Sequence, residues 1–174
     1  MNSLHIALSL AASLTLLQAQ DPLSNEARQA WNRTKNNVIA AAEKMPESDY
    51  DFKPAPESQS FRQLIAHTAD SSMGACSGFN GERKMAGAAS KTSKSDLVAA
   101  LKSAMEECDK AYNSITDAKA TEMIEGRGGQ RTRLGSLYGN TIHIEHEYAQ
   151  MAVHLRLKNQ VPPSSEGRGG GKKK

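Results

Sequence analysis

Outside its last nine residues, the sequence lacks net charge. The 174 residues carry a formal charge of +3, and segment 166–174 alone holds four basic residues against one glutamate, which accounts for the whole excess. A surface that binds nucleic acid needs clustered lysine and arginine to neutralise phosphates. The body of the chain is therefore not expected to bind nucleic acid, and it also lacks the acidic clusters of a metal-dependent nuclease. The glycine-rich, basic tail 166–174 is predicted to be disordered.

Charged residues are also missing from the first 19 residues. Within them, residues 6–17 are almost entirely apolar or small, a run about as long as the hydrophobic part of a signal peptide and too short to cross a bilayer. The sequence predicts a signal peptide over residues 1–19, although an N-terminal lysine or arginine is missing and Leu17 is unfavourable for cleavage after Ala19. A buried N-terminal helix is the alternative. No later run is apolar enough to cross a membrane, so the mature chain is expected to be exported, periplasmic or secreted, without a transmembrane anchor.

Cysteine is scarce, with Cys76 and Cys108 as the two examples. They are too far apart for the CxxC pattern of redox and zinc motifs. In a cytosolic protein they would be two buried thiols, whereas behind a signal peptide they are expected to form a disulfide. With 31 residues between them, the chain-entropy model gives such a bond about 3–4 kcal/mol of stabilisation.

The remaining sequence lacks strand-like alternation and internal repeats, and four segments show helical spacing of apolar residues instead. Helices are expected from about Ser24 to Met45, from Ser58 or Ser60 to about Gly78–Gly81, from about Ser95 to Ile115 and from about Arg133 to Lys158. Of the links between them, 48–58 is expected to be an ordered extended connection that tucks Tyr50 and Phe52 against the helices, 81–94 a mobile loop and 126–132 a further connection. The sequence therefore predicts one all-α four-helix bundle over residues 22–165.

Polar residues follow one edge of the apolar face of the last predicted helix. On a helical wheel this edge holds Asn140, His143, Glu147 and His154, while His146 lies on the opposite side. The second predicted helix repeats the arrangement, because His67 lies just beside its apolar face. Asp70, by contrast, is expected to face solvent.

This pattern makes His67, His143 and Glu147 candidate metal ligands. His143 and Glu147 are separated by four residues, so their side chains share one helix face and can grip a single ion. Two imidazoles and one carboxylate would leave positions open for water or substrate, as in catalytic sites. The alternative is that these histidines are polar residues satisfied at the edge of the core.

Three stretches, DYDFKPAPES, FRQLIAHTAD and NTIHIEHEYAQMAVHLRLKNQVPPSS, resemble the DinB-like superfamily, and in particular an exported bacterial branch that ends in VPPSS. The resemblance covers most of the mature chain. It implies an up-down four-helix bundle with a divalent metal, commonly zinc or nickel. The ligands would be one histidine on the second helix, matching His67, and an H-x-x-x-H pair on the last, whose first member matches His143.

Glu147 stands where the family pattern has its last histidine. It could be an oxygen ligand in a changed site, or it could mark a bundle that has lost its metal. His154, where relatives often have tyrosine, is a candidate extra ligand or proton carrier, and Asn140 is a candidate supporting or ligand-binding residue on the same edge.

Three functions are compatible with these features. The first is an exported protein that binds a metal ion and a small molecule. The second is a metal-dependent enzyme resembling thiol transferases or isomerases, or a hydrolase-like one, although no nucleophile or acid–base pair is evident beside the candidate ligands. The third is a metal-free structural or interaction bundle. Bundles of this type often dimerise, but no apolar stripe in the sequence assigns an interface.

Overall fold

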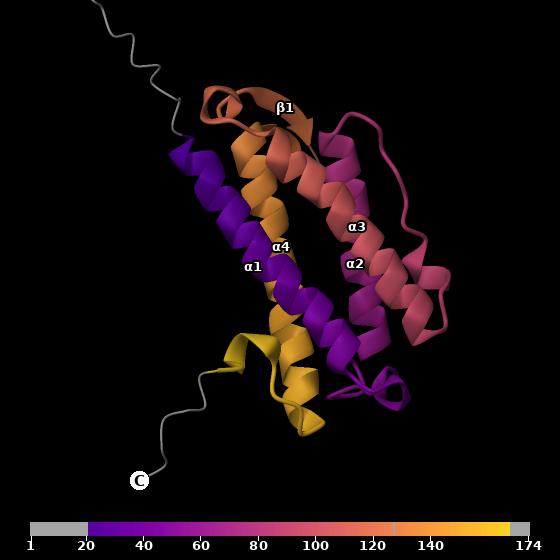
Figure 1. The fold of residues 1–174 in the computed structure, drawn as a ribbon. Coiled ribbons are helices and arrows are strands. Elements are labelled where there is room, and N and C mark those ends of the chain that lie inside the picture. The colour runs from indigo at the N-terminus through magenta and orange to yellow at the C-terminus, as the bar shows by residue number, and fades with distance from the viewer. Residues whose placement is uncertain (1–20, 127, 168–174) are drawn as a thin grey trace, which may run out of the picture.

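The computed structural model describes residues 21–126 and 128–167. The predicted signal peptide 1–19 and most of the predicted tail, residues 168–174, lie outside these ranges. Four long helices and one small hairpin make up the fold (Figure 1). They are α1 (Pro22–Lys44), α2 (Phe61–Phe79), α3 (Lys94–Ser114), β1 (Met123–Gly126), β2 (Gly129–Thr132) and α4 (Arg133–Leu157). The all-α four-helix bundle is therefore confirmed.

The helix starts follow from local capping. Ser60 and Gln63 form a reciprocal capping box at the start of α2, which satisfies backbone N–H groups that have no partner within the helix. Ser93 and Thr132 cap α3 and α4 by accepting from a backbone N–H three residues later. The third helix thus begins near the predicted Ser95, with Ser93 as the cap.

The helices do not alternate strictly in direction, which corrects the expected up-down order. Near the start of α2, Arg62 donates to the carbonyl of Thr92, just before α3. Towards their other ends the same two helices are joined through Cys76 and Cys108. α2 and α3 are therefore parallel, and the segment 80–93 that links them runs back along the outer side of the two helices (Figure 1). The order could not be read from helical periodicity, which carries no information on helix direction.

The hairpin is a second difference from the sequence-based prediction, which had no strands. β1 and β2 pair antiparallel, with Ile124 opposite Arg131 and Gly126 opposite Gly129. Each strand has four residues and is largely exposed, so it carries no alternating apolar pattern. Gly128 and Gly129 have φ values of 95° and 111°, a backbone conformation that favours glycine. The hairpin leads directly into α4.

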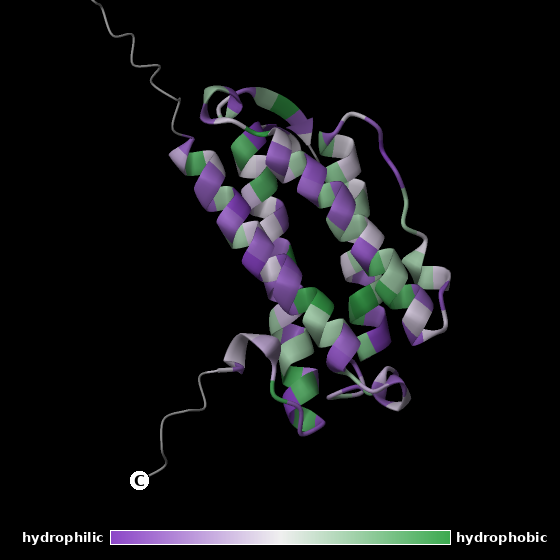
Figure 2. Cartoon of the chain, in the orientation of Figure 1, coloured by the Kyte–Doolittle hydropathy of each residue, from purple (hydrophilic) through white to green (hydrophobic). Residues whose placement is uncertain are grey.

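Buried apolar residues from all four helices form one core. Hydrophobic and hydrophilic residues alternate along each helix ribbon (Figure 2). Trp31 stacks on Tyr112 with ring centroids 4.7 Å apart, which joins α1 to α3. The Tyr112 hydroxyl donates to the Leu137 carbonyl at 2.7 Å and so reaches α4. Cys76 and Cys108 form a buried disulfide between α2 and α3. No described helix is long and apolar enough to span a membrane.

Both long connections are attached to the bundle. Tyr50 is fully buried, as expected, and donates to the Ala42 carbonyl at 2.7 Å. Asp70 was expected to face solvent, and this is wrong: its carboxylate accepts from the backbone N–H groups of Ala88 and Ala89 at 2.9 and 3.1 Å. Asp70 thereby holds the returning segment 80–93 against α2.

Candidate metal site

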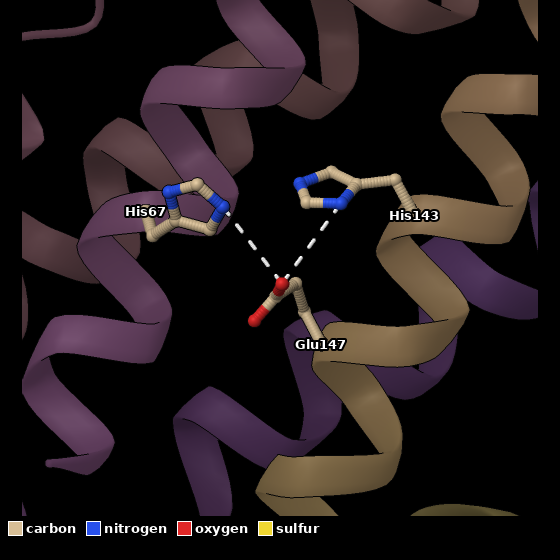
Figure 3. A group of neighbouring side chains, drawn as sticks. All are labelled: His67, His143 and Glu147. Carbon is tan, nitrogen blue, oxygen red and sulfur yellow. Dashed lines mark ion pairs between the residues drawn. The ribbon is translucent and has the colours of Figure 1, made fainter. Parts of the chain in front are cut away.

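Three predicted ligands meet between α2 and α4. His67 extends from α2, and His143 and Glu147 extend from successive turns of α4, all pointing into the same space (Figure 3). The distance from Glu147 Oε1 is 3.8 Å to His67 Nε2 and 3.9 Å to His143 Nδ1. The two imidazole rings are nearly perpendicular, with centroids 5.2 Å apart. The antiparallel packing of α2 on α4 therefore brings together residues 80 positions apart in the sequence.

The separations of the three donor atoms suit a shared cation. One donor atom from each residue lies within 4.8 Å of the others. Three atoms at mutual distances of about 3.8 Å have a common point about 2.2 Å from each, close to zinc–nitrogen and zinc–oxygen bond lengths of about 2.0–2.2 Å. At the upper limit of 4.8 Å between donor atoms, the common point lies about 2.8 Å from each atom. Side-chain shifts below about 1 Å would therefore bring all three donor atoms to bonding distance of one ion. The residues could hold one divalent metal ion.

Burial differs sharply among the three residues. The Glu147 side chain is 6% exposed, whereas those of His67 and His143 are 46% and 39% exposed. The carboxylate thus lies at the base of the cluster and the imidazoles at its solvent side. Glu147 Oε2 accepts a hydrogen bond from Gln150 Nε2 at 3.2 Å. Among the residues described, nothing donates a hydrogen bond to Oε1, and the two imidazole nitrogens face it beyond hydrogen-bonding distance.

The environment of His143 favours the neutral imidazole. Burial lowers its pKa below the ordinary value of 6.5, the carboxylate of Glu147 partly opposes this, and positive charge on His67 or His146 would lower the pKa further. A histidine ligates a metal through a neutral ring nitrogen. The local electrostatics therefore keep His143 in the form that a metal site requires.

The other histidines of α4 lie elsewhere. His146 is exposed, as the helical wheel predicted. His154 is buried, with Nδ1 2.9 Å from the Gln150 carbonyl and Nε2 3.1 Å from the Gln59 carbonyl. Both ring nitrogens of His154 thus face backbone oxygens, and its contacts join α4 to the segment before α2.

Asn140 also has packing partners. Its side-chain nitrogen lies 3.2 Å from the Tyr112 hydroxyl and 4.0 Å from Cys108 Sγ. The structure therefore groups His67, His143 and Glu147, and it places Asn140 and His154 in other contacts.

Gln150 is the residue that sequence reasoning missed. Its position three residues after Glu147 predicts contact on one helix face, which was the available signal.

A family model described as the DinB superfamily matches residues 30–151, more than half of the chain. A DinB-like protein from Bacillus cereus has a similar structure, with a TM-score of 0.68 and 15% identity over 80% of this chain and 95% of that one. A DinB-like protein from Bacillus subtilis has a TM-score of 0.64 and 20% identity, over 79% of this chain and 94% of that one. A conserved protein from Enterococcus faecalis has a TM-score of 0.62 and 15% identity, over 77% of this chain and 95% of that one. At these identities the three structures support the fold. A search of curated proteins finds no match to the sequence.

Proposed function

This chain belongs to the DinB superfamily, and we propose that within this fold it binds one divalent metal ion through His67, His143 and Glu147. The ion keeps open positions on its solvent side, where a small molecule binds. Three protein ligands leave such positions in metal sites that bind exchangeable ligands. Because both imidazoles are half-exposed, we expect these positions to face solvent.

The observation that carries the proposal is the environment of Glu147 Oε1. A buried carboxylate is costly unless its charge is compensated by hydrogen bonds or a cation. Here Oε1 faces two imidazole nitrogens at 3.8 and 3.9 Å, too far for hydrogen bonds and suitable for a cation between them. Glu147 can thus serve as a metal ligand in place of the family histidine, because it faces both imidazoles.

The donor set favours zinc or nickel. Imidazole nitrogen suits both metals, and one carboxylate adds a negative charge that offsets part of the charge of the ion. Once bound, the cation would act as a Lewis acid and lower the pKa of a coordinated water or thiol. The protein residues have separate roles in this arrangement. Glu147 supplies charge from the base of the site, Gln150 orients its carboxylate through Oε2, and His143 stays neutral through burial.

Export to an oxidising compartment is part of the proposal. The buried Cys76–Cys108 disulfide supports it, because such bonds persist mainly outside the cytosol. The uncharged segment 1–19 provides the proposed signal peptide.

Metal content tests the proposed function. The mature protein, purified without a histidine tag and incubated with zinc or nickel, is expected to retain about one equivalent after desalting. His67→Ala and His143→Ala are each expected to abolish retention. His146→Ala is the matched control, because this exposed histidine lies on the same helix and outside the cluster. Less than about 0.1 equivalent in the unsubstituted protein, or loss of metal in the His146 variant alone, would overturn the proposal.

A further inference from the structure

Two helix glycines lie opposite each other on the same side as the metal cluster. Three contacts show how α2 runs antiparallel along α4, and they join Gln59 to His154, His67 to Glu147, and Phe79 to Arg133. In each pair the two residue numbers add up to nearly the same value. By this register, Gly74 of α2 lies at the level of Gly139 of α4.

Both glycines share a helix face with a proposed ligand. Gly74 follows His67 by seven residues and Gly139 precedes His143 by four, spacings that return to the same side of a helix. With a rise of about 1.5 Å per residue, they lie about 10 Å and about 6 Å along the helices from the metal cluster. They mark a strip of surface that begins at the metal cluster and runs towards the hairpin.

An arginine side chain reaches each glycine from a different element. Arg83, from segment 80–93, has Nη2 3.9 Å from the position of a Cβ on Gly74. Arg131, from β2, has Nη1 3.6 Å from the position of a Cβ on Gly139. Two guanidinium groups from different elements therefore approach the same level of the α2–α4 surface.

Packing does not account for these glycines. A Cβ at 3.9 or 3.6 Å from its neighbour makes ordinary van der Waals contact, so alanine would fit at Gly74 and Gly139. Glycine within a helix is less stable than alanine, because it loses more conformational freedom on folding. This loss of helix stability occurs at both Gly74 and Gly139, each of which lies close to a guanidinium group.

The ion pair of the adjacent Glu82 is with Lys84, at 3.9 Å, and does not involve Arg83. Within residues 21–126 and 128–167, Arg83 makes no hydrogen bond or ion pair. Arg131 has five N–H donors, as every arginine does, and can bind an anion while it keeps other contacts.

We propose that Arg83 and Arg131 bind the anionic end of the small molecule whose other end coordinates the metal. The ligand class is a short organic acid with a metal-binding atom at one end and a carboxylate at the other. Guanidinium groups pair with planar carboxylates through two parallel hydrogen bonds, and the glycines leave the surface between the two ends uncovered. This inference deepens the proposed function and depends on it for the metal end of the ligand.

Carboxylic acids of increasing length test the inference. Acetate, succinate and adipate are titrated by calorimetry into the zinc-loaded mature protein. Adipate is expected to bind at least about tenfold more tightly than acetate, because only a longer diacid reaches both ends. Arg83→Gln and Arg131→Gln are expected to remove this advantage without changing zinc affinity. Arg33→Gln, an exposed α1 variant with the same charge change, is expected to keep it.

A second pair of variants separates binding from folding. Gly74→Ala and Gly139→Ala are expected to raise the melting temperature, since alanine favours the helix, and to weaken adipate binding. Equal affinity for acetate and adipate, or an unchanged adipate advantage in the Arg83 variant, would overturn the inference. If the protein takes up no metal, the proposed function fails separately. In that case, adipate binding to the metal-free protein that is lost in Arg83→Gln would still support the carboxylate site at Arg83 and Arg131. No adipate binding to the metal-free protein would overturn that site.

Discussion

His143 and Glu147 lie one turn apart on α4, with Nδ1 3.9 Å from Oε1. This distance exceeds that of a hydrogen bond and matches two ligands of one cation. The relationship makes Glu147 the residue whose substitution separates metal binding from folding. A structural ion pair between these residues would contribute to stability without metal, whereas a metal ligand contributes mainly when the metal is present.

Glu147→Gln is therefore expected to have opposite effects on metal affinity and on the metal-free protein. Loss of the ligand charge should weaken zinc or nickel binding by about 100-fold or more. Removal of a buried, poorly compensated charge should raise the free energy of unfolding without metal, by about 1 kcal/mol. Calorimetric metal titration and urea unfolding in a chelator measure the two effects. Unchanged metal affinity, or a loss of stability without metal, would contradict this role for Glu147.

Glu107 is expected to make the fold sensitive to acid. Its buried carboxylate accepts from Asn80 and pairs with Lys110, and these contacts lower its pKa from 4.5 to about 2. Because the folded-state pKa is the lower one, the stabilisation is complete above about pH 4.5 and is lost as the pH falls towards 2. It amounts to about 3 kcal/mol.

Urea unfolding of Glu107→Gln at pH 7 and at pH 2.5 measures this effect. The variant should be less stable than the parent at pH 7, and the difference should shrink to about a quarter of that value at pH 2.5. Glu106→Gln, which changes the exposed neighbour, is the control and should behave as the parent does at both values. A constant difference between parent and Glu107 variant across this range would show that the carboxylate does not titrate as described.

The disulfide is expected to stabilise the fold. Replacement of Cys76 and Cys108 together by alanine should lower the free energy of unfolding by about 3 kcal/mol, because the open chain has more conformational freedom when unfolded. Metal content should stay at one equivalent, since neither cysteine belongs to the metal cluster. Thermal unfolding with and without a reductant checks the parent protein. An unchanged melting temperature after complete reduction would contradict the prediction.

Asp70→Ala is expected to release the returning segment. The substitution removes the acceptor of the Ala88 and Ala89 N–H groups, at a cost of about 1–3 kcal/mol. Limited proteolysis followed by mass spectrometry should show faster cleavage within 80–93. Glu82→Ala, inside the same segment, is the control, because its carboxylate is exposed and, among the described residues, its ion pair is with Lys84. Equal cleavage rates in the parent and the Asp70 variant would contradict this anchoring role.

The sequence predicted the features that depend on local periodicity. Helical spacing placed all four helices, and the wheel separated His143 and Glu147 from His146 because side-chain direction repeats along a helix. The predicted grouping with His67 required an inference across helices, and the structure brings these side chains within 4.8 Å.

Features that depend on tertiary packing were not predicted. The parallel direction of α2 and α3 depends on the path of segment 80–93, which Asp70 attaches through backbone N–H groups that any residue could provide. The hairpin carries no apolar alternation because it is largely exposed. The partners of His154 are backbone carbonyls, which have no sequence pattern at all.

The central claim is that His67, His143 and Glu147 bind one metal ion, and anomalous diffraction tests it most directly. A crystal of the zinc- or nickel-loaded mature protein is measured on both sides of the metal absorption edge. The expected result is one anomalous peak about 2.0–2.2 Å from His67 Nε2, His143 Nδ1 and Glu147 Oε1. A fully loaded crystal whose peak lies at His146, at His154 or at any site without Glu147 would contradict the claim.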